Sequence, residues 1–149
     1  MGDLETILQQ GELFDGLSAE ELQSIAAICR EKRLRAGETI TRQGEEGDEL
    51  FIVCEGAVEV SLTVPGPDSS ARAVVHLGRG QIFGEMALVD QGPRSATVRS
   101  TADNTLLQAM GRQEFMDLCE RNHHLGYVVM RNMAADLSFK LRHRNLTGR

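Results

Sequence analysis

The hydrophobic and polar positions of this chain change period along its length and divide it into three segments. In residues 1–33 apolar side chains recur at intervals of three and four, which is the period of an amphipathic helix. Leu4, Ile7 and Leu8 share one face of a first short helix, and Gly11 can end it. We therefore expect helices in the N-terminal segment.

A second helix is predicted to begin at Ser18, because Ser18 and Glu21 have the spacing of a capping box. Four apolar residues continue its buried face at helical spacing: Leu22, Ile25, Ala26 and Cys29. Three basic residues fall near its C-terminal end, where the helix dipole favours cations: Arg30, Lys32 and Arg33. A patch for nucleic acid is the alternative interpretation of this basic cluster, and the capped helix end is the one that we favour.

From about residue 34 to residue 110 the period becomes two, which is typical of β-strands. One predicted strand alternates polar with apolar residues, and its apolar members are Val58, Val60, Leu62 and Val64. Residues 50–54 are continuously apolar, which predicts a strand that is covered on both faces. Residues 65–70 have turn chemistry, and residues 73–77 and 105–110 are predicted as further strands. Short strands separated by glycines predict a jelly-roll (double-stranded β-helix) barrel.

Residues 111–149 return to the helical period. A short helix is predicted over residues 112–119, with three apolar residues packed on the barrel: Phe115, Met116 and Leu118. A long helix is predicted over residues 125–144, with an apolar stripe at intervals of three and four: Tyr127, Met130, Ala134, Leu137 and Leu141. Such a stripe either packs on its own domain or forms a seam between two copies of the helix. The fold class is therefore mainly β with flanking helices, in one domain over residues 1–149.

Composition narrows the class of protein. The 149 residues are 41% hydrophobic and 26% charged, which is ordinary for a soluble domain, and the net charge of -6 disfavours nonspecific binding to nucleic acid. The chain has no long apolar run for a membrane span, and residues 1–5 lack the basic and apolar regions of a signal peptide, so the expected location is the cytoplasm. Three cysteines without metal-ligand spacing are expected to be reduced thiols: Cys29, Cys54 and Cys119.

Candidate chemistry concentrates in residues 83–98. There Glu85 and Arg94 bring a carboxylate and a guanidinium into a strand-rich segment, beside Gly84 and the small residues 95–97. An arginine fork next to accessible backbone amides suits a single phosphate, and the carboxylate suits a sugar hydroxyl. A phosphate and a ribose hydroxyl together indicate a nucleotide. The alternative is a plain ion pair between Glu85 and Arg94 across two strands.

Residues 83–88 and 93–98 resemble the phosphate-binding cassette of the cyclic nucleotide-binding domain family. This family includes the bacterial catabolite activator, the regulatory subunits of protein kinase A and cyclic nucleotide-gated channels. Residues 47–53 and 56–60 are also similar to early strands of this family, so the resemblance extends over nearly the whole chain.

The resemblance implies that Glu85 holds the ribose 2'-hydroxyl and that Arg94 holds the cyclic phosphate. The other ligand contacts that we expect are Phe83, Gly84, Met86, Ala87, Ser95, Ala96, Val74 and Lys140. Ser95 follows the cassette arginine, and serine occurs there in bacterial relatives that bind cyclic AMP. Cyclic AMP is therefore the expected ligand, with cyclic GMP as the alternative. Asp136 stands approximately where the catabolite activator has an arginine near the ligand, and Lys140 lies one turn further along the helix.

The expected function is a regulatory module rather than an enzyme. No cofactor or metal is expected, because His76 is the one histidine within residues 34–110 and no catalytic constellation can be placed. The resemblance implies a homodimer through residues 125–144 and a signal that passes through this helix to an unidentified protein partner. A DNA-reading module needs supporting helices for which residues 145–149 leave no room, so no nucleic-acid binding by this chain alone is expected. The alternative is a sensor fragment of a longer transcription regulator or of a channel.

Overall fold

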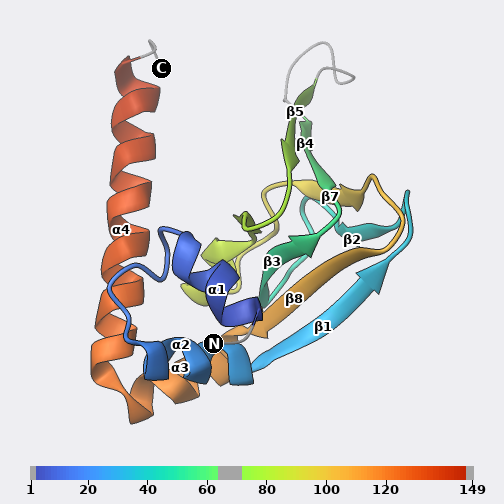
Figure 1. Cartoon of the computed structure of the whole chain (residues 1–149). Helices are drawn as coiled ribbons and strands as arrows, with labels where there is room; N and C mark the ends of the chain where they lie inside the picture. Colours follow the sequence, from blue (N-terminus) through green and yellow to red (C-terminus); the bar gives the residue numbers. More distant parts are fainter. Residues whose placement is uncertain (1–2, 64–71, 147–149) are drawn as a thin grey trace. The chain divides into compact units, whose positions relative to one another are not determined.

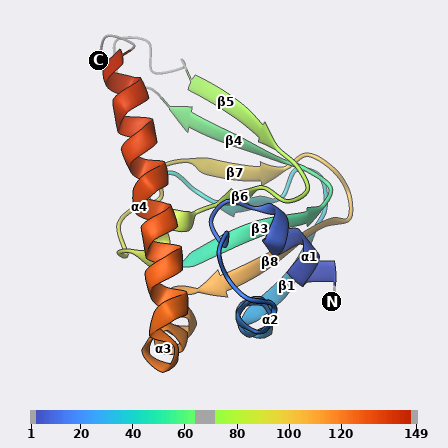
Figure 2. The same cartoon turned by 60° about the vertical axis from the view of Figure 1, so that its left-hand side comes forward.

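The computed structural model describes residues 3–63 and 72–146, whose strands form two antiparallel sheets of four strands each (Figure 1). One sheet has the order β1 (Cys29–Leu34), β8 (Thr105–Gly111), β3 (Glu49–Glu55) and β6 (Ile82–Phe83). The other has the order β2 (Thr39–Thr41), β7 (Thr97–Ser100), β4 (Val58–Thr63) and β5 (Arg72–Leu77). Figure 2 shows β1, β8 and β3 side by side. The mainly β class with flanking helices is confirmed, although among the described residues the sheets are not closed into a barrel.

The described chain groups into two compact units. Residues 28–115 form one, called the strand unit below. The chain before residue 28 and after residue 115 forms the other, called the helical unit. The helices of the molecule are α1 (Asp3–Gln10), α2 (Ala19–Ala27), α3 (Arg112–Arg121) and α4 (His123–Leu146). Of the helices that the structure describes, none combines the length and the apolar content needed to cross a bilayer.

Residues 29–34 form the edge strand β1, where the sequence predicted the end of a helix. Helix α2 ends at Ala27, and β1 pairs along its length with β8, from Cys29 opposite Met110 to Leu34 opposite Thr105. The charged run of β1 has no apolar helical period of its own, so its main-chain hydrogen bonds to β8 decide its conformation. Charged side chains on an edge strand also oppose pairing with other chains. The assignment of Cys29, Arg30, Lys32 and Arg33 to the second helix is therefore wrong.

The other predicted strands are present in the strand unit. Strands β4 and β5 are antiparallel partners, from Val58 opposite Leu77 to Thr63 opposite Arg72. Strand β8 confirms the predicted last strand, and β3 is buried from Leu50 to Cys54, as its continuous apolar run predicted. The predicted alternation at Val64 and the turn at residues 65–70 lie outside the described residues.

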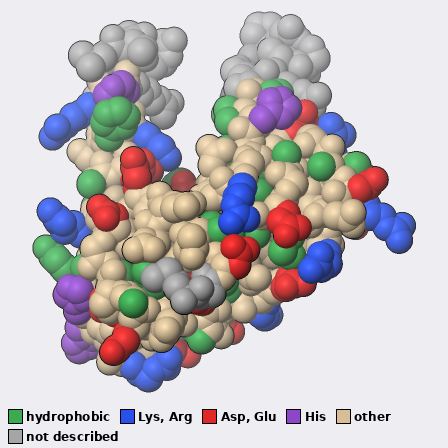
Figure 3. All heavy atoms as spheres, in the orientation of Figure 1, with side chains coloured by type: hydrophobic (Ala, Val, Ile, Leu, Met, Phe, Trp, Pro, Cys, Tyr) green, Lys and Arg blue, Asp and Glu red, His purple; other side chains and the backbone are tan. Residues whose placement is uncertain are grey.

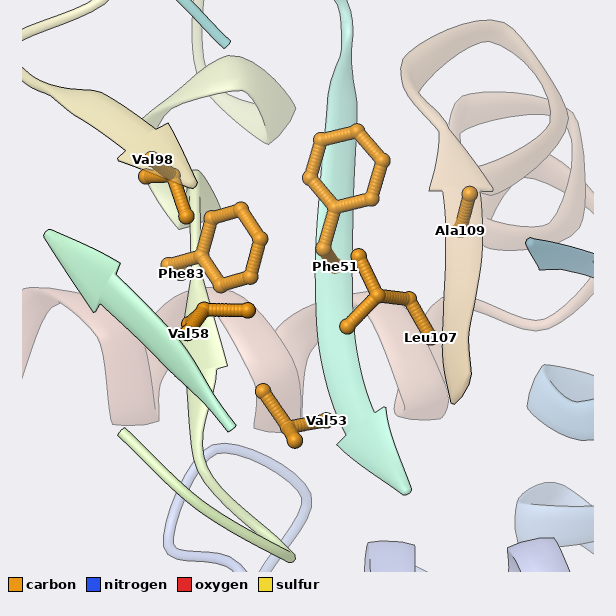
Figure 4. Close-up of a cluster of buried hydrophobic side chains, with 7 residues drawn as sticks. All are labelled: Phe51, Val53, Val58, Phe83, Val98, Leu107 and Ala109. Atoms are coloured by element: carbon orange, nitrogen blue, oxygen red, sulfur yellow. The ribbon is translucent and has the colours of Figure 1, made fainter. Parts of the chain in front are cut away.

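The hydrophobic core of the strand unit draws on strands of both sheets. Figure 4 shows one cluster of seven of its buried side chains: Phe51, Val53, Val58, Phe83, Val98, Leu107 and Ala109. The rings of Phe51 and Phe83 stack with their centroids 5.0 Å apart and their planes at 21°. Because aliphatic residues dominate this core, the two stacked rings are its largest rigid elements, and they lie beside the cassette segment.

In the helical unit, α2 begins with the predicted capping box. The Ser18 amide donates to Glu21 Oε1 at 3.0 Å, and the Glu21 amide donates to Ser18 Oγ at 3.1 Å. The second carboxylate oxygen of Glu21 accepts from Asn122 Nδ2 at 3.1 Å and lies 2.8 Å from His124 Nδ1. Glu21 is only 8% exposed, so one carboxylate ties the start of α2 to the junction between α3 and α4.

The buried face of α4 is not the predicted apolar stripe. Leu125, Val129 and Met133 are buried, whereas Tyr127 and Leu141 are 65% and 59% exposed. Of the other stripe members, Ala134 is exposed and two are half-buried, namely Met130 and Leu137. Figure 3 shows hydrophobic, basic and histidine side chains together near the C-terminal end of this helix. The stripe is therefore largely a surface feature of the single chain rather than part of its core.

Cys29, Cys54 and Cys119 are thiols outside any disulfide bond, as predicted. Burial, with a smaller contribution from Cys54, raises the pKa of Cys29 to about 12. Burial also raises the pKa of Cys119, with a smaller contribution from Glu120. Both thiols are therefore protonated and weakly reactive at neutral pH.

Candidate functional site

The strand unit contains a cavity of about 440 Å3, which is within the range of small-molecule sites. Eight of the predicted site residues line it: Phe83, Gly84, Glu85, Met86, Ala87, Arg94, Ser95 and Ala96. These residues come from β6, from the short helix after it and from the segment that leads into β7. The structure therefore brings most of the predicted site together around one hollow.

A short 3-10 helix, η1 (Glu85–Leu88), carries the carboxylate of the site. Gly84 precedes it with φ 77° and ψ 16°, a left-handed conformation that glycine adopts without steric cost. The first turn closes when the Ala87 amide donates to the Gly84 carbonyl oxygen at 3.1 Å. Glu85 and Met86 consequently stand at the start of a tight turn whose small neighbour, Ala87, is buried against the unit.

Arg94 is held by the main chain of two other segments. Its amide donates to the Glu45 carbonyl oxygen at 2.7 Å, and its own carbonyl oxygen accepts from the Gly44 amide at 2.9 Å. Its side-chain Nη1 donates to the Glu49 carbonyl oxygen at 2.8 Å. A main-chain carbonyl therefore orients the guanidinium, and the other donors of the fork are oriented with it.

Two glycines leave the space that the Arg94 guanidinium occupies. A Cβ atom on Gly47 would lie 2.0 Å from Arg94 Nε, and one on Gly84 would lie 2.8 Å from Arg94 Nη1. Both distances are far below van der Waals contact. Gly47 is thus a site residue that the motif did not assign, although the sequence segment beginning at Gly47 was part of the resemblance.

Aromatic and acidic neighbours surround the cation. The Arg94 Cζ atom lies 5.6 Å from the centroid of the Phe51 ring, a favourable position for a cation–π contact. Burial lowers the pKa of Arg94, and the carboxylates of Glu49 and Asp48 oppose that shift. An arginine remains protonated in proteins, so the cavity presents a partly buried positive charge. Such a charge attracts an anion more strongly than a fully solvated one.

Apolar side chains form the rest of the wall. Strands β4, β5, β6 and β7 contribute most of them: Val60, Val75, Leu77, Ile82 and Val98. Thr41 and Asp90 also line the cavity, and Thr41 Oγ1 donates to the Ala96 carbonyl oxygen at 3.2 Å. The sequence did not assign these residues, because their common position depends on strand pairing rather than on a contiguous motif.

Two predicted contacts are not among the cavity residues. Strand β5 contributes Val75 and Leu77 to the wall, and Val74 does not line it, since alternate residues of a strand face the same side. Lys140 belongs to α4 in the helical unit, where its Nζ lies 2.9 Å from Asp136 Oδ2. Its approach to a ligand stays a prediction.

Histidine side chains do not contribute to the cavity wall. Among the described residues, no group of three or more histidine, cysteine, aspartate or glutamate side chains is arranged to hold a metal ion. His76 lies on β5 opposite Glu59 of β4. The cavity offers the Arg94 cation, the carboxylates of Glu85 and Asp90 and an apolar wall. Together these groups suit a small ligand with an anionic group, hydroxyl groups and a flat apolar part.

Comparison with known proteins agrees with this arrangement. Residues 31–122 match the family model described as the cyclic nucleotide-binding domain. The chain is 34% identical to the cyclic AMP receptor protein of Thermus thermophilus over 134 residues, which are 90% of this chain and 59% of that protein. The chain therefore spans less than two thirds of the length of this relative.

Solved structures are similar as well. The N-terminal domain of a transcriptional regulator from Streptomyces coelicolor has a TM-score of 0.80 and 27% identity, with 93% of this chain and 94% of that chain covered. The regulatory domain of Toxoplasma gondii PKA, solved with cAMP, has a TM-score of 0.68 and 34% identity. That comparison covers 77% of this chain and 42% of the other.

Proposed function

The chain belongs to the cyclic nucleotide-binding domain family, and from this membership we propose that it is a signal-sensing module whose ligand is cyclic AMP. Domains of this family bind a regulatory nucleotide and are not catalytic. We further propose that the module works in the cytoplasm and passes its signal through α4 to a protein partner.

The observation that carries the proposal is the position of the Arg94 guanidinium in the cavity. The guanidinium is oriented by the Glu49 carbonyl oxygen, lies between Gly47 and Gly84, and shares the cavity with Glu85. In the proposed complex Arg94 binds the cyclic phosphate and Glu85 accepts a hydrogen bond from the ribose 2'-hydroxyl. The base lies against the apolar wall. Each part of the ligand thus meets a group of matching chemistry.

Two relatives support the choice of nucleotide. The similar protein from Thermus thermophilus is named for cyclic AMP, and the similar Toxoplasma gondii domain was crystallised with cAMP. Ser95, next to Arg94, is a small exposed residue that lines the cavity. Cyclic GMP is the competing ligand, and direct comparison of the two nucleotides decides between them.

Calorimetric titration with cyclic AMP, cyclic GMP, cyclic di-GMP and 5'-AMP tests the proposal. We expect cyclic AMP to bind with micromolar or tighter affinity and 5'-AMP much more weakly, because an open phosphate is bulkier and more strongly hydrated. Replacing Arg94 with alanine leaves the bound anion without its partner. This change is expected to cost about 2–5 kcal/mol, a loss of roughly thirtyfold or more in affinity.

Arg99→Ala is the matched control. Arg99 lies on β7 close to the cassette in sequence, but its guanidinium pairs with Glu59 at 3.2 Å and it does not line the cavity. Its loss should leave affinity for cyclic AMP within about twofold of the unchanged protein, because an exposed ion pair contributes little. If Arg94→Ala behaved like Arg99→Ala, the assignment of the phosphate site would be wrong.

A further inference from the structure

The basic residues of β1 reach across the sheet toward the cassette arginine. Arg30 and Lys32 are two residues apart and therefore point to the same face of β1. In the sheet order β1–β8–β3, the register places Arg30 beside Ala109 and Ala109 beside Phe51 (Figure 1). The small side chain of Ala109 on the middle strand leaves room for long side chains to pass from β1 toward β3.

Both basic side chains converge on one carboxylate of β3. Arg30 Nη2 donates to Glu49 Oε2 at 2.5 Å, and Lys32 Nζ donates to Glu49 Oε1 at 3.4 Å. Each oxygen of Glu49 therefore has its own cation. The Glu49 side chain is 17% exposed, whereas those of Arg30 and Lys32 are 65% and 43% exposed, so the carboxylate is partly shielded and the two cations stand at the surface.

Glu49 is also the residue that orients Arg94. Its main-chain oxygen accepts the Arg94 Nη1 hydrogen bond, and its carboxylate is close enough to act on the charge of Arg94. Lys32 Nζ and Arg94 Cζ lie 5.5 and 5.6 Å from the centroid of the same ring, that of Phe51. Glu49 therefore contacts the Arg94 guanidinium with its main-chain oxygen and the two cations of β1, Arg30 and Lys32, with its carboxylate.

A carboxylate near a guanidinium competes with a phosphate for the same donors. Both are anionic acceptors that match the guanidinium fork. Without Arg30 and Lys32, Glu49 would be a half-buried carboxylate that has lost both of these cations, and pairing with Arg94 would offset part of its desolvation cost. A ligand would then have to displace that carboxylate before it could bind.

We propose that Arg30 and Lys32 are positioning residues of the phosphate site, which hold the Glu49 carboxylate away from Arg94 and so keep the guanidinium available to an anionic ligand. This inference rests on the proposed binding of a cyclic nucleotide at Arg94. It gives a role to the basic cluster that the sequence alone assigned to a helix end.

Calorimetry of four variants with cyclic AMP tests the inference. The double variant Arg30→Gln/Lys32→Gln should bind about tenfold more weakly than the unchanged protein. The triple variant, which adds Glu49→Gln to this double variant, lacks the competing charge but keeps the main-chain oxygen. Its affinity for cyclic AMP should return to within about twofold of the unchanged protein. Arg30→Lys keeps a cation at this position and should retain the affinity. Arg33→Gln is the control, because Arg33 pairs with Glu31 at 3.0 Å rather than with Glu49.

The possible outcomes separate the two ideas. If the unchanged protein binds no cyclic nucleotide, the proposed function fails and the inference fails with it. If the protein binds but Arg30→Gln/Lys32→Gln binds equally well, only the inference is wrong. If the triple variant stays as weak as the double variant, the cations act by long-range attraction of the ligand, and the positioning role is again overturned. Urea unfolding of each variant confirms that the comparison is made between folded proteins.

Discussion

At the scale of single residues, the space around Arg94 determines what its neighbours can be. The backbone of Gly47 lies outside the left-handed region, so alanine can adopt its conformation without strain. The added Cβ atom would nevertheless overlap the Arg94 side chain, with 2.0 Å to Nε. The requirement for glycine at this position therefore comes from a neighbouring side chain and not from the backbone.

The first prediction at this scale concerns Gly47→Ala. The displaced guanidinium should lose its hydrogen bond to Glu49, and affinity for cyclic AMP should fall by about tenfold or more. The control is Gly78→Ala, because an added Cβ atom there has nothing within 4 Å. Calorimetry of both variants makes the comparison. Equal affinities for Gly47→Ala and Gly78→Ala would show that the guanidinium tolerates displacement.

The second concerns Glu85 and the ribose. If Glu85 accepts a hydrogen bond from the 2'-hydroxyl, 2'-deoxy cyclic AMP should bind the unchanged protein less tightly than cyclic AMP. The expected difference in binding free energy is that of a hydrogen bond to a charged group, about 1.5–3 kcal/mol. Glu85→Gln keeps the shape of the side chain but weakens the acceptor, so this variant should discriminate little between the two nucleotides. Equal binding of both nucleotides to the unchanged protein would remove Glu85 from the ribose site.

At the scale of elements, Glu21 links α2 to the junction of α3 and α4 and makes that link sensitive to acid. Burial raises the pKa of the Glu21 carboxyl, but hydrogen bonds from His124, the Ser18 amide and Asn122 outweigh burial and hold the pKa below its ordinary value. A carboxyl with a depressed pKa in the folded state contributes stability above its unfolded pKa. That contribution is lost as the pH falls through the folded pKa.

We therefore expect Glu21→Gln to have a lower free energy of unfolding than the unchanged protein at neutral pH. The difference between the two free energies should become smaller as the pH falls. Urea unfolding at a series of pH values from about 7 to about 3 measures both curves. Glu20→Gln is the control, because Glu20 is the exposed neighbour on the same turn. A gap between the Glu21→Gln curve and that of the unchanged protein that stayed constant over this range would contradict the assigned role of the carboxylate.

The elements also show how far sequence reasoning reaches. Helix α2 was predictable because its capping box is local, and the cassette was predictable because its residues are nearly contiguous. Strand β1 was not predictable, because its charged run acquires its conformation from pairing with β8, and β8 lies at the other end of the strand unit in sequence. The place of Val75, rather than Val74, in the cavity wall could not be predicted for a related reason. Residues 73–75 are all apolar, so the side of β5 that faces the cavity follows only from its pairing with β4.

At the scale of the whole molecule, the exposed part of the α4 stripe leads us to propose association between copies of the chain. Single-chain packing does not use Tyr127 or Leu141, which are largely exposed, whereas the buried face uses Leu125 and Val129. We expect a weak homodimer through α4 whose strength changes with ligand, because a helix that contacts both a ligand and a second copy has a different energy in each state.

Replacing Leu137 and Leu141 with aspartate should give folded monomers, since Leu141 is 59% exposed and Leu137 is only half-buried. Sedimentation of the protein and the variant, each with and without cyclic AMP, measures the association. Loss of cooperative unfolding in the variant would indicate that the stripe is part of the core. A protein that stays monomeric at tens of micromolar under both conditions would exclude the dimer.

The position of Tyr127 has a practical consequence for all of these measurements. The chain has no tryptophan and one tyrosine, so its tyrosine emission comes from a single, largely exposed ring on α4. Any event that buries or reorients this ring, whether association of two helices or closure over a nucleotide, should change the intensity of that emission. The unmodified protein therefore carries an optical probe on α4, the helix that we propose to transmit the signal, and no label is needed to test that role.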